Sequence, residues 1–342
     1  MKIRNARSAA TITATALAMS LGLAACGGGG GEGDSVTMRL GHVFPDGSEI
    51  DEAADSFAAA VEERTDGAVK IDVFAGGQIG SDEEMATALN SGTQEAAILS
   101  QGSAGFGDPS QLGNLPYLVS NFEQADKVFF GDGFIAEWDK KTLKENGIIG
   151  LEFVENGFRA LSNSKRKVES PDDVKGLKVR APSTDMIISI FDTWGAQATA
   201  IPFPELYTAL EQGTVDGQEN GVTLFRDSKF GEVQKYFTDT RYTFATAVFS
   251  VSETTWNGLD EDQQSILQEE AEKASLKQRK DVRANVQAAL DELKGQIDVT
   301  VLTDEQLEEW RASTQPVYEQ ARKTFGSDTI DELLAAVEAA QS

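Results

Sequence analysis

The sequence predicts an α/β fold with two lobes, and three observations indicate it. Segments with strand and helix patterns alternate from residue 35 to residue 100, which is typical of a sheet with parallel strands. Roughly 310 residues follow the N-terminal segment 1–25, a length that favours two domains over one. Residues 260–294 contain no glycine or proline and predict one helix of about 50 Å, long enough to span two lobes.

The N-terminal segment 1–25 has the pattern of an export signal. Lys2, Arg4 and Arg7 form a basic start, and the run 9–23 consists of small and apolar residues. This run lacks the roughly 20 strongly apolar residues that a spanning helix needs. A basic start, an apolar stretch and small residues before a cleavage point together predict a signal peptide.

The sequence LAAC at 23–26 resembles the bacterial lipobox, in which the cysteine becomes the lipidated first residue of the exported protein. A plain signal peptide with a chance cysteine is the alternative. The glycine-rich stretch after Cys26 supports the lipobox, because it would act as a flexible polar tether. We therefore expect a lipoprotein signal peptide over 1–25 and a lipid-anchored tether over 26–34, with the protein exported and held at the outer face of the cell membrane.

The composition excludes several kinds of chemistry. Cys26 is the only cysteine and His42 is the only histidine. If Cys26 carries lipid, the exported domain has no thiol for a disulfide, a metal ligand or a nucleophile. A zinc site of the ordinary His/Cys type and a Ser-His-Asp or Cys-His catalytic system are excluded on the same grounds.

The chain is also strongly acidic, with a formal net charge of −26. Removing Lys2, Arg4 and Arg7 with the signal takes away three positive charges and leaves about −29. This charge argues against a nucleic acid partner. It also repels anions, although salt limits the field to roughly 8 Å. An anion-binding site in this chain would therefore need its own buried cations.

The first lobe begins with a regular alternation of elements. Alternating residues over 35–41 predict a strand, and apolar spacing over 50–64 predicts a helix. A second strand is predicted over 68–74. A glycine-rich loop then leads to a helix capped near Ser81, with acids in its first turn, and to an apolar strand over 96–100.

The rest of the chain repeats the pattern less regularly. We expect an apolar strand over 146–153, after which 157–166 crosses into a new region. Because its apolar positions keep no strict heptad, residues 260–294 favour a single helix over the coiled-coil alternative. The other expected elements are strands at 176–182, 196–202 and 244–259, and helices at 184–194, 202–213, 303–325 and 327–340.

The stretch GLKVRAP at 176–182 contains one residue with two interpretations. Leu177, Val179 and Ala181 alternate onto one face, while Lys178 and Arg180 share the other. On this pattern alone Arg180 is either a solvated strand residue or a guanidinium held for an anion. The guanidinium could offer two parallel donors to a carboxylate and would stay charged in a partly dry site.

Several ordered motifs resemble those of one known family. They are AGGQIGSDEEM (75–85), NLPYLV (114–119), NGFRALSN (156–163), VKGLKVRAP (174–182) and PFPELYTALEQGTVDGQEN (202–220). Together they are similar to the DctP type of extracytoplasmic solute receptor of tripartite ATP-independent periplasmic (TRAP) transporters. The resemblance runs from about Arg39 to Trp256 and is weaker through the long helix.

The resemblance implies a fold like that of periplasmic binding proteins, in which each lobe is a sheet flanked by helices and the ligand lies in a cleft between them. Lobe 1 would comprise 35–156 plus 244–285, and lobe 2 would comprise 157–243 plus 286–342. The helix near 260–294 would join the two lobes. The cleft would close over the ligand by a hinge.

The resemblance also implies the site. Arg180 occupies the place of the arginine that pairs with a ligand carboxylate, and Arg159 and Asn220 occupy places that join it. An ion pair of Arg159 with an acid such as Glu155 is the alternative. Gly221 departs from the proline that the family usually has after this asparagine, and glycine leaves the backbone freer.

Four further residues are weaker candidates for the ligand site. Gln78 and Glu84 would face the cleft from the first lobe, and Glu84 could equally be a surface acid. His42 follows the first strand, so its ring could reach a ligand hydroxyl. Phe203 could form an apolar wall or simply pack in the core. No cofactor and no metal are expected.

We therefore expect a solute-binding protein, not an enzyme, that captures a small organic anion and delivers it to TRAP membrane subunits. A C4-dicarboxylate, a sugar acid, a keto acid and an aromatic acid all remain open as ligands. A monomer is expected, with no nucleic acid partner. The alternatives are an exported glycosidase or lyase with two carboxylates, and an ABC-type receptor or sensor on the same two-lobe plan.

Overall fold

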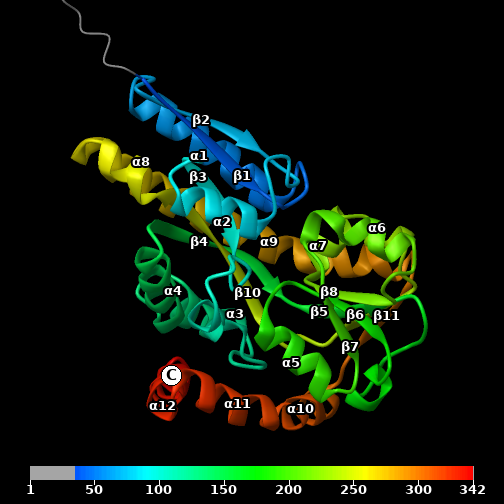
Figure 1. Ribbon diagram of the computed structural model, residues 1–342. Helices are drawn as coiled ribbons and strands as arrows, with labels where there is room; N and C mark the ends of the chain where they lie inside the picture. Colours follow the sequence, from blue (N-terminus) through cyan, green and yellow to red (C-terminus); the bar gives the residue numbers. More distant parts are fainter. Residues whose placement is uncertain (1–34, 342) are drawn as a thin grey trace, which may run out of the picture. The chain divides into compact units, whose positions relative to one another are not determined.

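Two β-sheets organise residues 35–341, which are the residues that the computed structural model describes. The predicted signal peptide 1–25, the tether 26–34 and Cys26 lie outside the described residues. Contacts join both sheets and their helices in one compact unit. Figure 1 shows the first sheet with its blue and cyan elements and the second sheet with its green elements.

The first sheet has the order β2-β1-β3-β10-β4. Strands β1, β2 and β3 are mutually parallel, as the alternation of strands and helices predicts, whereas β10 runs antiparallel to both β3 and β4. The strand predicted over 244–259 ends at Ser252, where a short helix begins. The bounds are β1 Val36–His42, β2 Val69–Phe74, β3 Ala96–Ser100, β4 Ile148–Phe158 and β10 Phe244–Ser252.

Helices of the first half pack on this sheet because their apolar faces are buried against it. In the first of them, Ile50, Phe57 and Val61 face the sheet and are almost fully buried. Ser81 caps the second helix reciprocally with Glu84, as predicted. The bounds are α1 Glu49–Arg64, α2 Asp82–Asn90, α3 Phe122–Phe129, α4 Phe134–Glu145 and α8 Glu253–Gly258, with a 3₁₀ helix η1 over Asp108–Asn114.

The second sheet has the order β11-β9-β5-β8-β6-β7. Strand β6 is parallel to β7 and β8, while β5 is antiparallel to β8 and β9. The bounds are β5 Ala160–Asn163, β6 Lys178–Ala181, β7 Gln197–Ala200, β8 Gly217–Asn220, β9 Tyr236–Asp239 and β11 Asp298–Val301. Its helices are η2 Pro171–Val174, α5 Asp185–Thr193, η3 Phe203–Glu205, α6 Leu206–Glu211, α7 Val222–Asp227 and η4 Phe230–Glu232.

The chain passes between the two sheets at two adjacent places. Strand β4 of the first sheet ends at Phe158, and β5 of the second begins at Ala160, so Arg159 is the residue at the crossing. The return passage runs from β9 to β10. The Arg159 amide donates to Thr243 O at 2.9 Å, and the Tyr242 amide donates to Arg159 O at 3.3 Å. These backbone bonds hold the two passages side by side.

The long helix α9 (Glu261–Lys294) is observed as predicted and contacts both halves. Its first part packs on α1 and β4, and its later part packs on α7 and β11. Gln278 fixes it to the first sheet, because its side-chain amide exchanges two hydrogen bonds of 2.8 Å with the backbone of Glu155. Residues Ala289, Leu290 and Leu293 join a separate apolar core beneath the second sheet.

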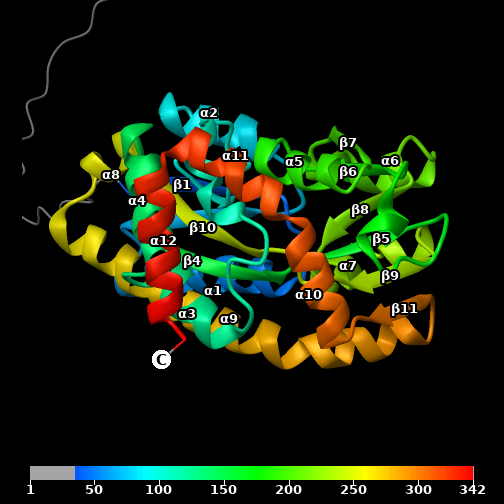
Figure 2. The same ribbon diagram turned by 90° about the horizontal axis from the view of Figure 1, so that it is seen from below.

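The C-terminal helices depart from the expected division into lobes. The helices α10 (Asp304–Ser313), α11 (Gln315–Phe325) and α12 (Ser327–Ala339) run along both halves, as Figure 2 shows in orange and red. Helix α11 packs on α5 and η1, and α12 packs on α3 and α4. The segment 286–342 is therefore not confined to the second half.

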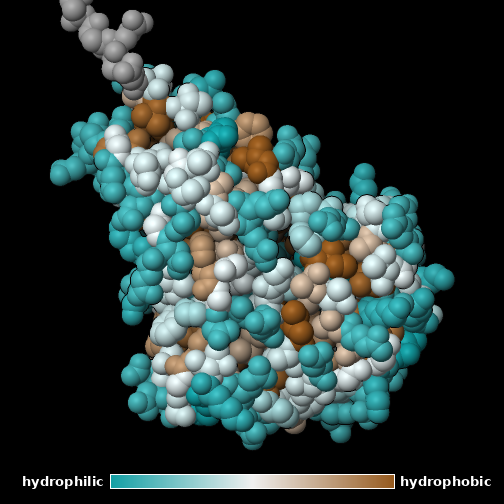
Figure 3. All heavy atoms as spheres, viewed as in Figure 1, coloured by the Kyte–Doolittle hydropathy of each residue, from teal (hydrophilic) through white to brown (hydrophobic). Residues whose placement is uncertain are grey.

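The face of the molecule in Figure 3 is mainly hydrophilic, with small separate hydrophobic patches. Among residues 35–341, none of the helices has both the length and the apolar character needed to cross a bilayer. Within the same range, no group of three or more His, Cys, Asp or Glu side chains could hold a metal ion.

Candidate ligand-binding site

A pocket lies between the two sheets, next to the crossing at Arg159. Its cavity volume is about 40 Å³, a few times the space that one water needs. The first half contributes Val43, Phe44, Ser81, Asp82, Glu83, Ser100, Ser103 and Asn156. The second half contributes Arg180, Pro182, Ser183, Pro202, Phe203, Asn220 and Leu224, and Arg159 lies between the two sets.

The first-half wall is built from the start of α2 and the end of β3. The helix begins at Asp82, and its carboxylate Oδ1 accepts a hydrogen bond of 2.8 Å from the Ser100 amide. Burial raises the pKa of Asp82 to about 6, although hydrogen bonds from Ser100 and the charge of Arg180 oppose this rise. Asp82 therefore lies within electrostatic reach of the opposite wall.

Arg180 forms the centre of the second-half wall. The side chain comes from the end of β6 and is only 2% exposed, so the interpretation as a solvated strand residue is wrong. Its Nε donates to Ile201 O at 2.8 Å, and the guanidinium carbon lies 5.8 Å from the ring centre of Phe203. Burial lowers the pKa of Arg180 to about 10, which the nearby Glu219 only partly offsets.

Arg159 is buried as well, but its charge is fully paired. Its Nε and Nη2 donate to both carboxylate oxygens of Glu219, and Nη2 also donates to Asn220 Oδ1 at 3.1 Å. Burial disfavours the charged form of Arg159, yet the Glu219 carboxylate outweighs it and raises the pKa. The predicted alternative partner, Glu155, instead pairs with Arg283 of α9 at 2.7 Å.

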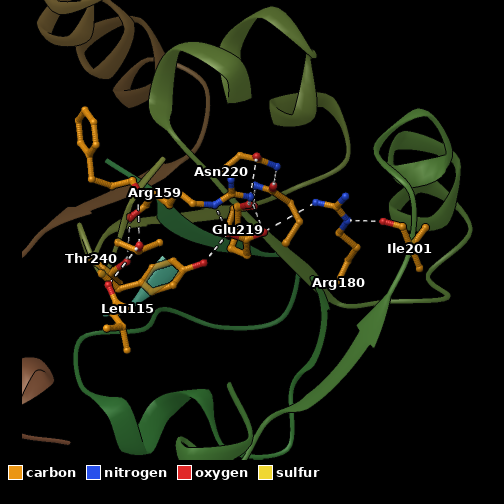
Figure 4. Close-up of polar contacts among 12 residues, drawn as sticks. Leu115, Arg159, Arg180, Ile201, Glu219, Asn220 and Thr240 are labelled. Atoms are coloured by element: carbon orange, nitrogen blue, oxygen red, sulfur yellow. Dashed lines mark hydrogen bonds and ion pairs between the residues drawn. The ribbon is translucent and has the colours of Figure 1, made fainter. Parts of the chain in front are cut away.

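Glu219 is the residue that links the two arginines, and Figure 4 shows it between them. Its side chain is fully buried, and it also accepts a hydrogen bond from the Tyr242 hydroxyl. The Arg180 Nη1 lies 3.7 Å from Glu219 Oε1, which is too long for a hydrogen bond. Within the described part of the chain, neither Nη atom of Arg180 donates a hydrogen bond, so its two terminal amino groups remain available.

Asn220 follows Glu219 on β8 and is held by a polar network. Its Nδ2 donates to Gln218 Oε1 at 2.6 Å, and the Gln218 amide donates to Ser162 Oγ at 2.9 Å. The next residue, Gly221, packs against the crossing strand. A Cβ at this position would lie 2.8 Å from the backbone oxygen of Asn156, so a larger residue would require β4 to move.

The weaker candidates separate into one that lines the pocket and three that do not. Phe203 lines it, as expected. His42 is fully buried and bonds Asp51 Oδ1 at 3.1 Å, and burial lowers its pKa. Glu84 is exposed and accepts from the Ser81 amide at 2.9 Å, and Gln78 is exposed on the preceding loop. These three side chains are therefore directed to other partners or to solvent.

Sequence reasoning missed Glu219, Tyr242, Asp82 and Asn156. A signal for the first was available, because an acid directly before the predicted ligand residue Asn220 would either repel an anion or neutralise a neighbouring cation. The other three carry no local signal. Asp82 on α2 and Asn156 on β4 meet at the pocket, and Tyr242 reaches Glu219, only through the tertiary fold.

Residues 40–324 match the model of the family described as bacterial extracellular solute-binding protein, family 7, which is named DctP. The chain is 30% identical over 308 residues to the 2,3-diketo-L-gulonate-binding periplasmic protein YiaO of Escherichia coli (strain K12). That match covers 89% of this chain and 92% of the relative.

Two solved structures are similar over nearly their whole length. The sugar acid binding protein DctPAm from Advenella mimigardefordensis, in complex with galactonate, has a TM-score of 0.85 and 33% identity. It covers 90% of this chain and 99% of its own. A TRAP periplasmic solute binding protein from Sulfurospirillum deleyianum with bound succinate has a TM-score of 0.83 and 29% identity, covering 88% and 99%. The predicted two-lobe α/β fold is thereby confirmed.

Proposed function

The chain belongs to the family-7 bacterial extracellular solute-binding proteins, the periplasmic receptors of TRAP transporters, and from this premise we propose that Arg180 anchors the carboxylate of its ligand. Related receptors bind small organic acids such as galactonate and succinate. The observation that carries the proposal is a buried guanidinium in the pocket with both terminal amino groups free of hydrogen bonds.

The physical basis is the cost of holding this cation away from water. Burial of Arg180 disfavours its charge, and Glu219 supports it only from 3.7 Å. A carboxylate that accepts two parallel N–H bonds would satisfy the guanidinium and restore the lost solvation. Exclusion of water in the closed pocket strengthens this pair.

Arg159 and Asn220 have a supporting role in the proposal. Arg159 is already bound to Glu219, and its Nη1 is the amino group that would reach the ligand. Because Asn220 contacts Arg159 at 3.1 Å, the two side chains present a fixed edge beside Arg180. Phe203, 5.8 Å from the Arg180 guanidinium, would cover the ligand from the side.

Transport then follows from capture and release. The two halves would close around the acid by rotation at the adjacent crossings near Arg159. The closed form would be presented to the TRAP membrane subunits, which take the ligand unchanged. We therefore propose a receptor without enzymatic turnover, and a mixture of protein and acid analysed over hours should return the acid intact.

We also propose that the protein is exported and anchored by lipid on Cys26. The support is the LAAC sequence at 23–26 and the glycine-rich stretch that follows it. In the full chain, Cys26→Ala should move the protein from the membrane pellet to the soluble fraction. A monomer is expected in light-scattering measurements of the exported part.

A thermal-shift and calorimetry screen of organic acids tests the anchor. At least one acid should raise the melting temperature of the wild-type protein. Arg180→Met should lose every such shift while circular dichroism shows an intact fold, because methionine keeps much of the volume without the charge. Arg166→Met, a change of an exposed arginine outside the pocket, should keep all of them. Binding by Arg180→Met at the wild-type affinity would refute the anchor.

A further inference from the structure

The two walls of the pocket carry opposite charges, and this arrangement bears on the chemical class of the ligand. Among the described residues that line the pocket, the cationic side chains are Arg159 and Arg180, both near the second sheet. The opposite wall contains two acids, Asp82 and Glu83, and no cation. An elongated ligand anchored at Arg180 would therefore direct its other end toward negative charge.

The arginine nearest the crossing does not alter this balance. Arg159 donates to both carboxylate oxygens of Glu219, so their charges cancel within the wall. Arg180 is thus the cation in the described pocket lining whose terminal amino groups make no hydrogen bond, with Glu219 only at 3.7 Å, and it has the capacity for one carboxylate. A second carboxylate would have no cationic partner and would meet Asp82, which is largely ionised at pH 7.5 because its pKa is about 6.

The same wall provides groups that suit hydroxyls. The side chains of Ser103 and Asn156 line the pocket on this wall and have no hydrogen-bond partner in the described part of the chain. Hydroxyl and amide groups can each donate and accept. The Asp82 carboxylate accepts from Ser100, with the backbone amide on Oδ1, and its remaining lone pairs can accept from a ligand hydroxyl.

We propose that the ligand is a hydroxylated monocarboxylate, bound with its carboxylate on Arg180 and its hydroxyls on the wall formed by Asp82, Ser103 and Asn156, and that this wall rejects diacids. This inference rests on the proposed carboxylate anchor at Arg180. It goes further by assigning selection to the opposite wall. An acid without hydroxyls should also be a poor ligand, because it would leave the polar groups of this wall buried without hydrogen-bond partners.

Two series of probes with matched chain length test the proposal by calorimetry. The four-carbon series is D-erythronate, its diacid meso-tartrate, and butyrate. The six-carbon series is D-gluconate, its diacid D-glucarate, and hexanoate. In at least one series the hydroxy acid should bind, and its diacid and its unhydroxylated analogue should each bind at least about tenfold more weakly.

Asp82→Asn tests the wall directly. Asparagine keeps the size and can still accept from the Ser100 amide, so the start of α2 is preserved. The variant should reduce the ratio of the diacid Kd to the hydroxy acid Kd by about tenfold, because the diacid no longer meets a like charge. Glu123→Gln, a change of an exposed acid on α3 outside the pocket, should leave this ratio of Kd values unchanged.

The outcomes separate this inference from the proposed function. Preferential binding of meso-tartrate or D-glucarate that is lost in Arg180→Met would overturn the ligand class and leave the anchor intact. The proposed ligand class would also be overturned if Asp82→Asn had the wild-type ratio of diacid Kd to hydroxy acid Kd. If neither hydroxy acid bound, the ligand class would be wrong, and if no organic acid bound, the anchor would fail with it.

Discussion

The two walls of the pocket differ in how firmly they are built. Arg159, Arg180, Glu219 and Asn220 on the second-half side are at most 7% exposed and are tied to one another or to the backbone. The first-half wall carries Ser103 and Asn156 without partners and the exposed acid Glu83. One wall is a fixed anchor and the other a set of free groups, so we attribute affinity to the first and selection to the second.

The largest expected effect comes from removing the charge that holds the anchor together. Glu219→Gln leaves Arg159 buried without its carboxylate and close to Arg180. We expect a loss of about 3–5 kcal/mol in the free energy of unfolding, measured by urea denaturation. Glu211→Gln, an exposed change on α6, should stay within about 0.5 kcal/mol of the wild type. A stable Glu219→Gln protein would mean that the two arginines do not depend on this acid.

Arg180→Met should behave in the opposite way. Burial lowers the pKa of Arg180, which means that the folded protein disfavours its charge, so removal should leave the unfolding free energy equal or higher. Ligand binding should weaken by about 2–5 kcal/mol, measured by calorimetry. If this variant lost as much stability as Glu219→Gln, Arg180 would be a structural residue like Arg159 and the contrast between them would disappear.

The rims of the two halves offer a smaller test. Gly77 has φ +74°, and a Cβ there would lie 2.6 Å from Pro204 Cγ in the opposite half. Gly76 has φ +62°, and a Cβ at Gly76 would have no atom within 4 Å. Both alanine variants carry the backbone strain, but only Gly77→Ala obstructs closure. It should bind about tenfold more weakly than Gly76→Ala, a difference of about 1.4 kcal/mol. Equal affinities would show that the halves do not close through this contact.

The smallest expected effect is the pH dependence of binding. Burial and the charge of Glu83 raise the pKa of Asp82, and the positive charge of Arg180 lowers it. A carboxylate bound to Arg180 would neutralise that positive charge and so cancel its effect on Asp82. For an acid that places no hydroxyl on Asp82, the pKa of Asp82 would therefore rise above about 6 on binding. Because the bound state then holds more protons, affinity should fall by a few-fold from pH 5.5 to pH 7.5. In Asp82→Asn the affinity should not change with pH over this range. If it fell as much as in the wild type, the pH dependence would come from another group.

The halves also differ in how well the sequence predicts them. Strands β1 and β2 alternate apolar and polar residues, β3 is a short apolar run, and capped helices separate the three, so their positions follow from local patterns. Strand β8 has the sequence GQEN, and all four residues are buried. Polar residues without alternation do not predict a buried strand. Their burial depends on partners such as Arg159, at the crossing between β4 and β5, and Ser162 on β5.

The site shows the same limit. Arg180, Arg159 and Asn220 line the pocket, and the resemblance to a family brought them forward, while Phe203, a weaker candidate, lines it as well. The pairing of Arg159 with Glu219 was not predictable from spacing, since sixty positions separate them. His42 was expected at the pocket because it ends a strand, yet the neighbouring helix supplies Asp51 as its partner.

The position of Arg159 at the crossing between the sheets implies an order of events. A residue on a pivot moves little when the two halves swing apart, and its bonds to Glu219 and Asn220 lie beside that axis. The receptor in its open state would thus already hold an assembled docking point. An acid from solution would bind first to the second half, and the first half would contact it only afterwards, as the two halves close.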